Sequence, residues 1–344
     1  MIVLSFDLRN LEGVLKGKKS IKDNTLSKEI IPEEGISAPV EVSLQVRIED
    51  EILKPKPKRV IDIDSLPDEL QEVYRELLMP VKTDISFDKV ILSKENHEKV
   101  IEFLKENECR ETLVEYGLKP MNRLLFFGAS GFGKTFLARV LSNHMGYTML
   151  YVDIAQALSE GRVAKNISSV FRLANYLKKS FVFMDEVDSI AWNRDSSKGD
   201  SADMRRATNS LFQNVDQMDE SNVFVSATNM INRLDEAFVR RFDMRFEFKA
   251  EYIDIVEAIR KFMFSKFRLL NDIDENGKMV MHRMLRLSYA EIDEITQRHM
   301  KRAILGGTDL IKVSDIFEDM AIGMRVNVNI PGMLKEDGEI LFPL

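Results

Sequence analysis

A glycine-rich loop between a strand pattern and a helix pattern limits what this chain can fold into more than any other stretch. Residues 128–135 read Gly-Ala-Ser-Gly-Phe-Gly-Lys-Thr, which fits the pattern of a glycine, four residues and then Gly-Lys-Ser/Thr. The apolar run 124–127 before it predicts a buried strand, and apolar residues recur at helical spacing after it. Glycines let the backbone turn its N–H groups toward a polyphosphate, and the helix dipole adds positive potential. The stretch therefore predicts a nucleoside triphosphate site.

Two residues of this loop have distinct predicted roles. We expect Lys134 to reach the β- and γ-phosphates and the Thr135 hydroxyl to bind Mg²⁺. The residues predicted to contact the nucleotide are Gly128, Ala129, Ser130, Gly131, Phe132, Gly133, Lys134, Thr135 and Phe136. The alternative, a chance glycine-rich turn, does not explain the order of strand, loop and helix.

The composition of the chain limits its expected partners and its cellular compartment. The 344 residues carry a net charge of −7, which disfavours a surface that coats nucleic acid but leaves a local basic groove open. The one cysteine, Cys109, excludes an intrachain disulfide and suits a reducing compartment. The N-terminus has no basic region before its short apolar run, and no apolar run approaches the ~18 residues of a membrane-spanning helix. We therefore expect a cytoplasmic protein. The scattered histidines show no metal-ligand spacing and are interpreted as structural.

Apolar runs alternate with helical patterns after the loop. Further strands are predicted at residues 149–152, 181–184 and 223–225, with helices between them. This alternation predicts an α/β fold with a parallel sheet covered by helices on both faces. From about residue 252 the strand signal vanishes, which predicts a separate, small all-α subdomain. The predicted divisions are a partner-selecting region and linker at 1–60, a connecting helix at 61–83, the α/β subdomain at 84–250, the helical lid at 251–324 and a tail at 325–344.

Two acidic residues follow the wholly apolar strand 181–184. Ligands in open α/β sheets bind at the carboxyl ends of the strands, which is where Asp185 and Glu186 are expected. Asp185 is predicted to hold Mg²⁺, and Glu186 to orient and deprotonate an attacking water. An isolated Asp-Glu pair would be interpreted as a solvated strand end. The phosphate loop about fifty residues earlier favours the catalytic interpretation.

Polar residues after the next strand complete the predicted site. Asn229 ends the Ser-Ala-Thr-Asn segment and is expected to hold the same water or touch the γ-phosphate. Arg240 and Arg241 suit phosphate neutralisation from a neighbouring subunit, because guanidinium forks match phosphate oxygens. The alternative for these arginines is an intrachain salt bridge at the surface.

These residues together resemble the AAA ATPase family. The loop and residues 183–191 resemble its Walker A and Walker B boxes, and Ala-Thr-Asn at 227–229 resembles sensor 1. Arg-Arg-Phe-Asp at 240–243 resembles the arginine-finger segment, and residues 288–292 resemble a second sensor that carries no arginine. The resemblance covers about residues 84–320. It implies a P-loop NTPase subdomain with a parallel five-stranded sheet and a small helical lid. It also implies ATP bound between subunits of a ring, usually a hexamer, and chaperone-like work on protein substrates.

Short bacterial single-ring AAA ATPases resemble this chain further, and some of those occur beside subtilisin-like peptidases. That resemblance implies a peptidase as a partner. The chain departs from the family in one loop, at residues 155–162, where an aromatic–apolar–Gly tripeptide usually faces the central pore. The loop has no aromatic residue and is about two residues short, so Leu158 would be its nearest substitute. The departure at Ala129 and Ser130, where the family usually has Pro-Pro, leaves the fitted positions intact.

The sequence therefore predicts an ATP hydrolase that remodels or unfolds a protein substrate as an oligomeric ring. We expect ATP and Mg²⁺ as cofactors, and neither a nucleic acid nor a membrane as partner. Two other functions stay open. A nucleotide-switched scaffold would use ATP only to set assembly, which the shortened loop favours. A nucleic-acid motor or loader on the same fold would need a basic, aromatic-studded stretch, which the sequence lacks.

Overall fold

The structure is a computed structural model that describes residues 56–57, 61–81, 85–158, 162–191, 202–249, 255–273 and 287–327. The chain divides into two units, 1–47 and 48–344, and every described residue belongs to the second. The predicted region 1–60 lies outside the described residues except for 56–57, and the predicted tail except for 325–327. Within the described ranges, no helix is both long and apolar enough to cross a membrane.

Five parallel strands form the sheet at the centre of the α/β part. The strands are β1 (Arg123–Gly128), β2 (Thr148–Val152), β3 (Ser180–Met184), β4 (Val223–Thr228) and β5 (Met244–Phe248). They lie in the order β2-β3-β4-β1-β5, and every neighbouring pair is parallel. The predicted parallel five-stranded sheet is thus confirmed. Its edge strand β5 alternates buried and exposed residues, so it does not show the apolar run from which the other strands were predicted.

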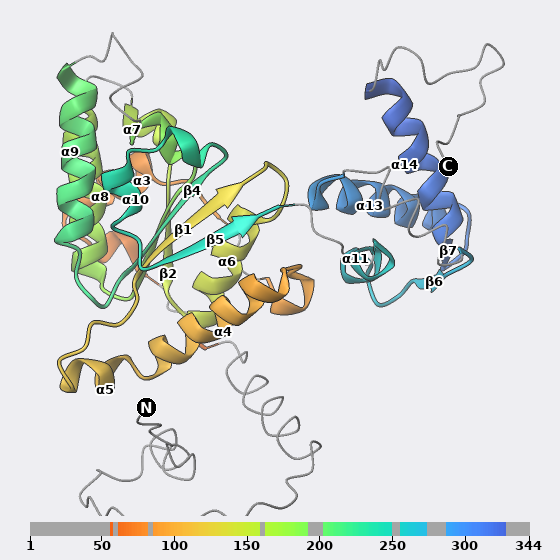
Figure 1. The fold of residues 1–344 in the computed structure, drawn as a ribbon, viewed down its shortest axis with the longest axis horizontal. Helices are drawn as coiled ribbons and strands as arrows, with labels where there is room; N and C mark the ends of the chain where they lie inside the picture. Colours follow the sequence, from red (N-terminus) through yellow and green to blue (C-terminus); the bar gives the residue numbers. More distant parts are fainter. Residues whose placement is uncertain are drawn as a thin grey trace, which may run out of the picture. The chain divides into compact units, whose positions relative to one another are not determined.

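Each face of the sheet is covered by helices (Figure 1). Alternate residues of β1 point to opposite faces, as the pleat of a strand requires. Leu125 belongs to one buried core, with the helices α3, α7, α8, α9 and α10. Leu124 and Phe126 belong to the other, with α4 and α6. All three side chains are fully buried, which explains why this strand is apolar over residues 124–127.

The α/β part has helices before β1 and between the later strands of the sheet. Their bounds are α3 (Asp68–Leu77), α4 (Lys94–Glu108), α5 (Arg110–Glu115), α6 (Lys134–Met145), α7 (Ile154–Leu158), α8 (Val163–Leu177), α9 (Ala202–Asp216) and α10 (Glu236–Val239). Short 3₁₀ helices are η1 (Ile63–Ser65), η2 (Phe87–Lys89), η4 (Val187–Ser189) and η6 (Ile231–Arg233). Ser93 caps α4 by accepting a hydrogen bond from the Asn96 N–H.

The C-terminal segment, residues 255–327, has its own buried core. Its elements are α11 (Ile255–Phe262), β6 (Arg268–Leu270), α13 (Tyr289–Leu305), β7 (Leu310–Lys312) and α14 (Val313–Asn327). The segment is mainly helical, as predicted, but it is not all-α, because β6 and β7 pair into a two-stranded parallel sheet. Strands of three residues are too short to produce a sequence pattern that distinguishes them from loops.

Candidate active site

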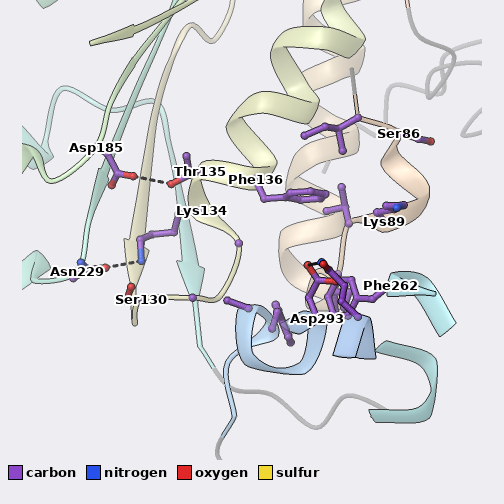
Figure 2. A pocket seen from close by; sticks show the side chains of 18 of the residues that line it. Ser86, Lys89, Ser130, Lys134, Thr135, Phe136, Asp185, Asn229, Phe262 and Asp293 are labelled. Atoms are coloured by element: carbon purple, nitrogen blue, oxygen red, sulfur yellow. Dashed lines mark hydrogen bonds between the residues drawn. The ribbon is translucent and has the colours of Figure 1, made fainter. Parts of the chain in front are cut away.

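A cavity of about 770 Å³ lies where β1, β3 and β4 end. This is the expected position for a ligand of an open α/β sheet. Its lining from the loop, α6 and the strand ends consists of Ser130, Gly131, Gly133, Lys134, Thr135, Phe136, Asp185, Glu186 and Asn229. The remaining wall comes from Ile85, Ser86, Lys89, Val90 and Ile91 and from Phe262, Phe264, Tyr289, Ala290, Asp293 and Gln297 of the C-terminal segment. Residues far apart in the sequence thus converge on one cavity (Figure 2).

The loop is held against its neighbours at positions where only glycine fits. Gly128 has a φ of 133°, and a Cβ there would lie 1.9 Å from the carbonyl oxygen of Phe248 in β5. A hydrogen bond of 3.2 Å from the Ala129 N–H to the same oxygen fixes the start of the loop. At Gly131, φ is 81° and a Cβ would lie 2.7 Å from the Ser288 side chain. Any side chain at either glycine would displace the backbone that shapes the cavity.

The N-terminus of α6 opens into this cavity without a capping side chain. Gly133 is its N-cap residue, and no side chain accepts a hydrogen bond from the first turn. The first N–H groups of a helix have no partner inside the helix, and they carry partial positive charge. An anion such as a phosphate group suits this position. The chain's own residues therefore fit the polyphosphate that the loop pattern predicts.

The Lys134 side chain lies inside the loop. It is buried, and its Nζ donates to the carbonyl oxygens of Gly128 and Ala129, both at 2.8 Å, and to Oδ1 of Asn229 at 2.7 Å. Burial lowers the pKa of Lys134, while the nearby carboxylates of Asp185 and Asp188 act in the opposite direction. A phosphate arriving at the loop would exchange with these acceptors and relieve the desolvation of the ammonium group.

Carboxylates and an amide meet Lys134 and Thr135 from two neighbouring strands (Figure 2). The Thr135 hydroxyl donates to Oδ2 of Asp185 at 2.7 Å. Hydroxyl and carboxylate oxygens side by side form a donor set that suits Mg²⁺, which usually keeps several waters. Asn229 follows β4 and accepts from Lys134. The structure thus brings together Lys134, Thr135, Asp185 and Asn229, as the sequence predicted.

Glu186 has an unusual backbone. Its φ of 52° and ψ of 39° are left-handed, a conformation that costs a residue other than glycine about 1–3 kcal/mol. Its N–H donates to Oδ1 of Asp185, and its carbonyl oxygen accepts from the Ser189 hydroxyl at 2.8 Å. The side chain is exposed and lines the cavity. The surrounding hydrogen bonds hold this carboxylate at the end of β3 despite the backbone strain.

The two predicted arginines differ in their surroundings, and neither lines the cavity described above. Arg240 is 70% exposed, and Glu236, one helical turn earlier, is its one ion-pair partner among the described residues. Arg241 donates from Nε to both carboxylate oxygens of Asp216 at 3.1 Å and from Nη1 to the Ala237 carbonyl at 2.6 Å. Its guanidinium group also covers a phenyl ring of α9 at 4.6 Å. Both arginines therefore have the intrachain salt bridge of the alternative interpretation, and Arg241 is held in addition by a backbone carbonyl and an aromatic ring.

Sequence reasoning missed a tyrosine beside the acidic pair. Tyr151 lies opposite Phe183 in the register of β2 and β3, and their rings are 5.1 Å apart. Asp185 is two residues beyond Phe183, so it is the diagonal neighbour that a long aromatic side chain reaches. Burial, then the charge of Asp185 and a hydrogen bond to it, raise the pKa of Tyr151 to about 12, and Glu186 adds to this. The sequence feature that could have indicated this role is the Tyr151 hydroxyl, the single polar group in the otherwise apolar run 149–152.

The C-terminal segment touches the phosphate loop directly. The Ala290 N–H donates to the Gly131 carbonyl at 3.1 Å, and the rings of Phe132 and Tyr289 are 5.4 Å apart. Ser288 and Glu291, which the sequence placed in a second sensor, form a capping box at the start of α13. Their side chains thus stabilise the helix end, and the neighbouring residues of α13 face the cavity.

The fold and the cavity define a P-loop nucleoside-triphosphate-binding protein. Residues 124–250 match the profile of the ATPase family associated with various cellular activities, AAA. Residues 124–250 therefore form an AAA ATPase domain.

Similar proteins carry related names. An uncharacterized AAA family ATPase of Sinorhizobium fredii is 27% identical over 68% of this chain and 70% of its own length. A 26S proteasome regulatory subunit 4 homolog of Dictyostelium discoideum is 30% identical over 48% of this chain and 39% of its own length. Cell division protein C of Sulfolobus acidocaldarius is 28% identical over 59% of this chain and 57% of its own length. The chain thus spans less than two thirds of the last two relatives. The family match and the relative named as an ATPase support ATP hydrolysis by this chain.

Proposed function

We propose that this chain is a Mg²⁺-dependent ATPase that works as a ring of identical subunits and remodels or unfolds a protein substrate. The observation that carries the proposal is the composition of the cavity. Its phosphate-loop side gathers Lys134, Thr135, Asp185, Glu186 and Asn229, while the exposed Arg240 lies outside it. Phosphoryl transfer in this cavity would use a further cation, and an exposed arginine of a neighbouring subunit could supply it.

The loop and α6 bind the triphosphate in this proposal. Backbone N–H groups at the start of α6 hold phosphate oxygens, and Lys134 neutralises the β- and γ-phosphates. Thr135 and Asp185 would hold Mg²⁺, which when bound neutralises charge on the phosphate oxygens. The cavity wall from the C-terminal segment leaves room for the nucleoside, since Tyr289 and Phe264 supply apolar surface there.

Glu186 and Asn229 act on the water. The Glu186 carboxylate accepts a proton from the water as its oxygen bonds to the γ-phosphorus, and the bond to the β–γ bridging oxygen breaks. Asn229 orients that water or contacts the γ-phosphate. Lys134 donates a hydrogen bond to the Asn229 amide oxygen, and that bond has to break first. Arg240 of the neighbouring subunit stabilises the charge that develops on the transferred phosphoryl group. We assign that role to Arg240 rather than to Arg241, because Asp216 and the Ala237 carbonyl hold Arg241, whereas Arg240 has a single exposed ion pair with Glu236 among the described residues.

A protein is the proposed substrate. One relative is named a proteasome regulatory subunit, which supports work on proteins, and the net charge of −7 disfavours nucleic acid. The family resemblance of the sequence supports a partner peptidase and a hexameric ring, and the composition of the chain supports a cytoplasmic setting. The predicted pore-facing loop is only partly described, because residues 159–161 lie outside the described ranges, and Leu158 ends α7.

A substitution at Glu186 tests the assignment. Glu186→Gln keeps the size of the side chain but cannot accept a proton, so turnover should fall by roughly 10²–10⁴-fold while ATP still binds. Glu247→Gln is the matched control, since Glu247 is an exposed residue of β5 paired with Lys249. Normal turnover by Glu186→Gln would show that another group takes the proton.

The same assay separates the rival functions. Stimulation of wild-type turnover by an unfolded protein such as casein supports remodelling, and stimulation by DNA supports a nucleic-acid motor. Assembly that follows ATP binding, with no stimulation by either, supports the nucleotide-switched scaffold.

A further inference from the structure

A hydroxyl group and a carboxylate form a hydrogen bond just behind the wall of the cavity. Thr228, the last residue of β4, is fully buried, and its Oγ1 donates to Oδ1 of Asp188 at 2.6 Å. Asp188 lies in η4, two residues after Glu186. Neither Thr228 nor Asp188 belongs to the residues named above as the lining of the cavity. The pair therefore lies beside the site without facing the space for the nucleotide.

This hydrogen bond is short and close to the charges of the site. A distance of 2.6 Å is typical of a hydroxyl group that donates to an ionised carboxylate, and such bonds are about twice as strong as neutral ones. Burial lowers the pKa of Lys134, and the charge of Asp188, after that of Asp185, opposes this shift. The carboxylate that accepts from Thr228 is therefore within electrostatic range of the lysine in the phosphate loop.

The same hydroxyl group also closes a turn around Asn229. While it donates to Asp188, Oγ1 of Thr228 accepts from the Met230 N–H at 2.9 Å. A threonine that accepts from the N–H two residues later forms an ST-turn, which restricts the backbone of the residue between them. Asn229 is that residue, and its side chain accepts from Lys134 inside the cavity. Donation to the carboxylate polarises the hydroxyl group and strengthens the bond that it accepts.

The segment that holds Asp188 is anchored to two other parts of the fold. The Ile190 carbonyl accepts from the hydroxyl group of Thr208 in α9 at 2.7 Å. The Ala191 carbonyl accepts from the Asp235 N–H, which precedes α10, at 3.0 Å. These bonds hold the segment in place, so the hydrogen bond of its carboxylate fixes the end of β4 relative to the end of β3.

We propose that the hydrogen bond between Thr228 and Asp188 positions Asn229 for the hydrolysis of ATP. The Asn229 amide and the Glu186 carboxylate act on the same water, and a misplacement of about 1 Å in such a site costs roughly 10²-fold in rate. A fixed backbone also allows the Asn229 side chain to exchange Lys134 for the water by rotation alone. Thr228 and Asp188 are thus positioning residues. The inference rests on the proposed function, which gives Asn229 its role.

Substitutions at Thr228 separate positioning from a merely structural role. In steady-state hydrolysis of ATP by the full chain with Mg²⁺, Thr228→Val keeps the shape of the side chain but removes the hydroxyl group. The kcat should therefore fall roughly 10–100-fold with KM unchanged, and Thr228→Ser, which retains the hydroxyl group, should restore most of the turnover. Thr296→Val is the matched control, because the hydroxyl group of this fully buried threonine donates within α13 to the Ile292 carbonyl. It should leave kcat unchanged.

A double-mutant cycle shows whether Thr228 acts through Asn229. If it does, Thr228→Val should lower kcat much less in an Asn229→Ala background than in the wild type, because the residue that it positions is gone. Losses that multiply in the double variant would overturn the inference. Wild-type kcat in Thr228→Val, together with a low kcat in Asn229→Ala, would also overturn it but leave the proposed function standing. Wild-type kcat in Asn229→Ala would refute the proposed role of Asn229 and the inference with it.

Asp188→Asn repeats the cycle from the other end of the hydrogen bond, and it decides the question if Thr228→Val does not fold. Its amide oxygen still accepts from the hydroxyl group but carries no charge, so kcat should fall less than in Thr228→Val. The loss should again be much smaller in the Asn229→Ala background. An Asp188→Asn loss that is equally large with and without Asn229 would contradict positioning through Asn229.

Discussion

Two adjacent arginines with different surroundings allow a matched test of the site. Arg240→Ala and Arg241→Ala make the same chemical change one residue apart. Arg240 is 70% exposed with one pair to Glu236 at a spacing of one turn. Such a pair contributes about 0.3–0.5 kcal/mol to stability. We therefore expect Arg240→Ala to change the free energy of unfolding by no more than about 0.5 kcal/mol.

Arg241 contributes more to stability because several contacts depend on it. Its side chain is 27% exposed, and it joins the segment after α10 to Asp216 at the end of α9. Hydrogen bonds to charged groups contribute about 1.5–3 kcal/mol, but Asp216 is 45% exposed, so solvent screening favours the lower end. The ring contact of its guanidinium with Phe212 adds about 0.5–1 kcal/mol. Arg241→Ala should lower the free energy of unfolding by about 2 kcal/mol.

Two assays separate these roles. Urea unfolding gives the stability of each variant, and steady-state ATP hydrolysis at saturating ATP gives its turnover. Arg240→Ala should lower turnover by about 10³-fold or more with its stability intact, as expected for an arginine finger supplied in trans. Equal stability losses in the two variants, or wild-type turnover in Arg240→Ala, would refute this division of roles.

Three further predictions follow from the site and the C-terminal core. Tyr151→Phe should lower kcat roughly tenfold with KM unchanged, because it removes a hydrogen bond to Asp185. Tyr147→Phe is the control and should leave kcat unchanged, because the hydroxyl of Tyr147 contacts Asn107 instead. Chelation of divalent cations should abolish turnover and added Mg²⁺ should restore it; turnover that persists in excess chelator would contradict the assigned metal site. Burial lowers the pKa of His299 from 6.5, although the charge of Asp319 opposes the shift. The unfolded state therefore binds the proton more tightly than the folded state does. As a result, the free energy of unfolding should fall as pH drops below about 6.5. Urea unfolding between pH 5 and 8 measures this dependence, which should flatten in His299→Gln.

Much of the fold could be predicted because its signals are local. A strand of a parallel sheet that is buried on both faces is usually apolar on both, so β3 and the first half of β4 contain apolar runs, at residues 181–184 and 223–225. The position of the acidic pair followed from the end of such a run. The loop pattern placed Lys134 and Thr135 because the spacing alone specifies their chemistry.

The remaining features depend on tertiary contacts that no local pattern encodes. β6 and β7 are three residues each and are separated by α13, so their pairing is set by packing of the C-terminal core. Adjacent arginines look identical in sequence, and the contacts of Arg241 with Asp216, the Ala237 carbonyl and the Phe212 ring distinguish it from Arg240. Tyr151 reaches Asp185 across two strands, which requires the register of β2 and β3.

A mixture of two inactive variants tests most directly whether ATP is hydrolysed at a site shared between neighbouring subunits. Glu186→Gln keeps its arginine but lacks the base, and Arg240→Ala keeps the base but lacks the arginine. In randomly mixed head-to-tail rings, roughly one interface in four joins an intact Glu186 to an intact Arg240 from the next copy. We predict that the equimolar mixture recovers ATP hydrolysis that neither variant shows alone. A mixture that forms mixed rings yet stays inactive would contradict the shared site.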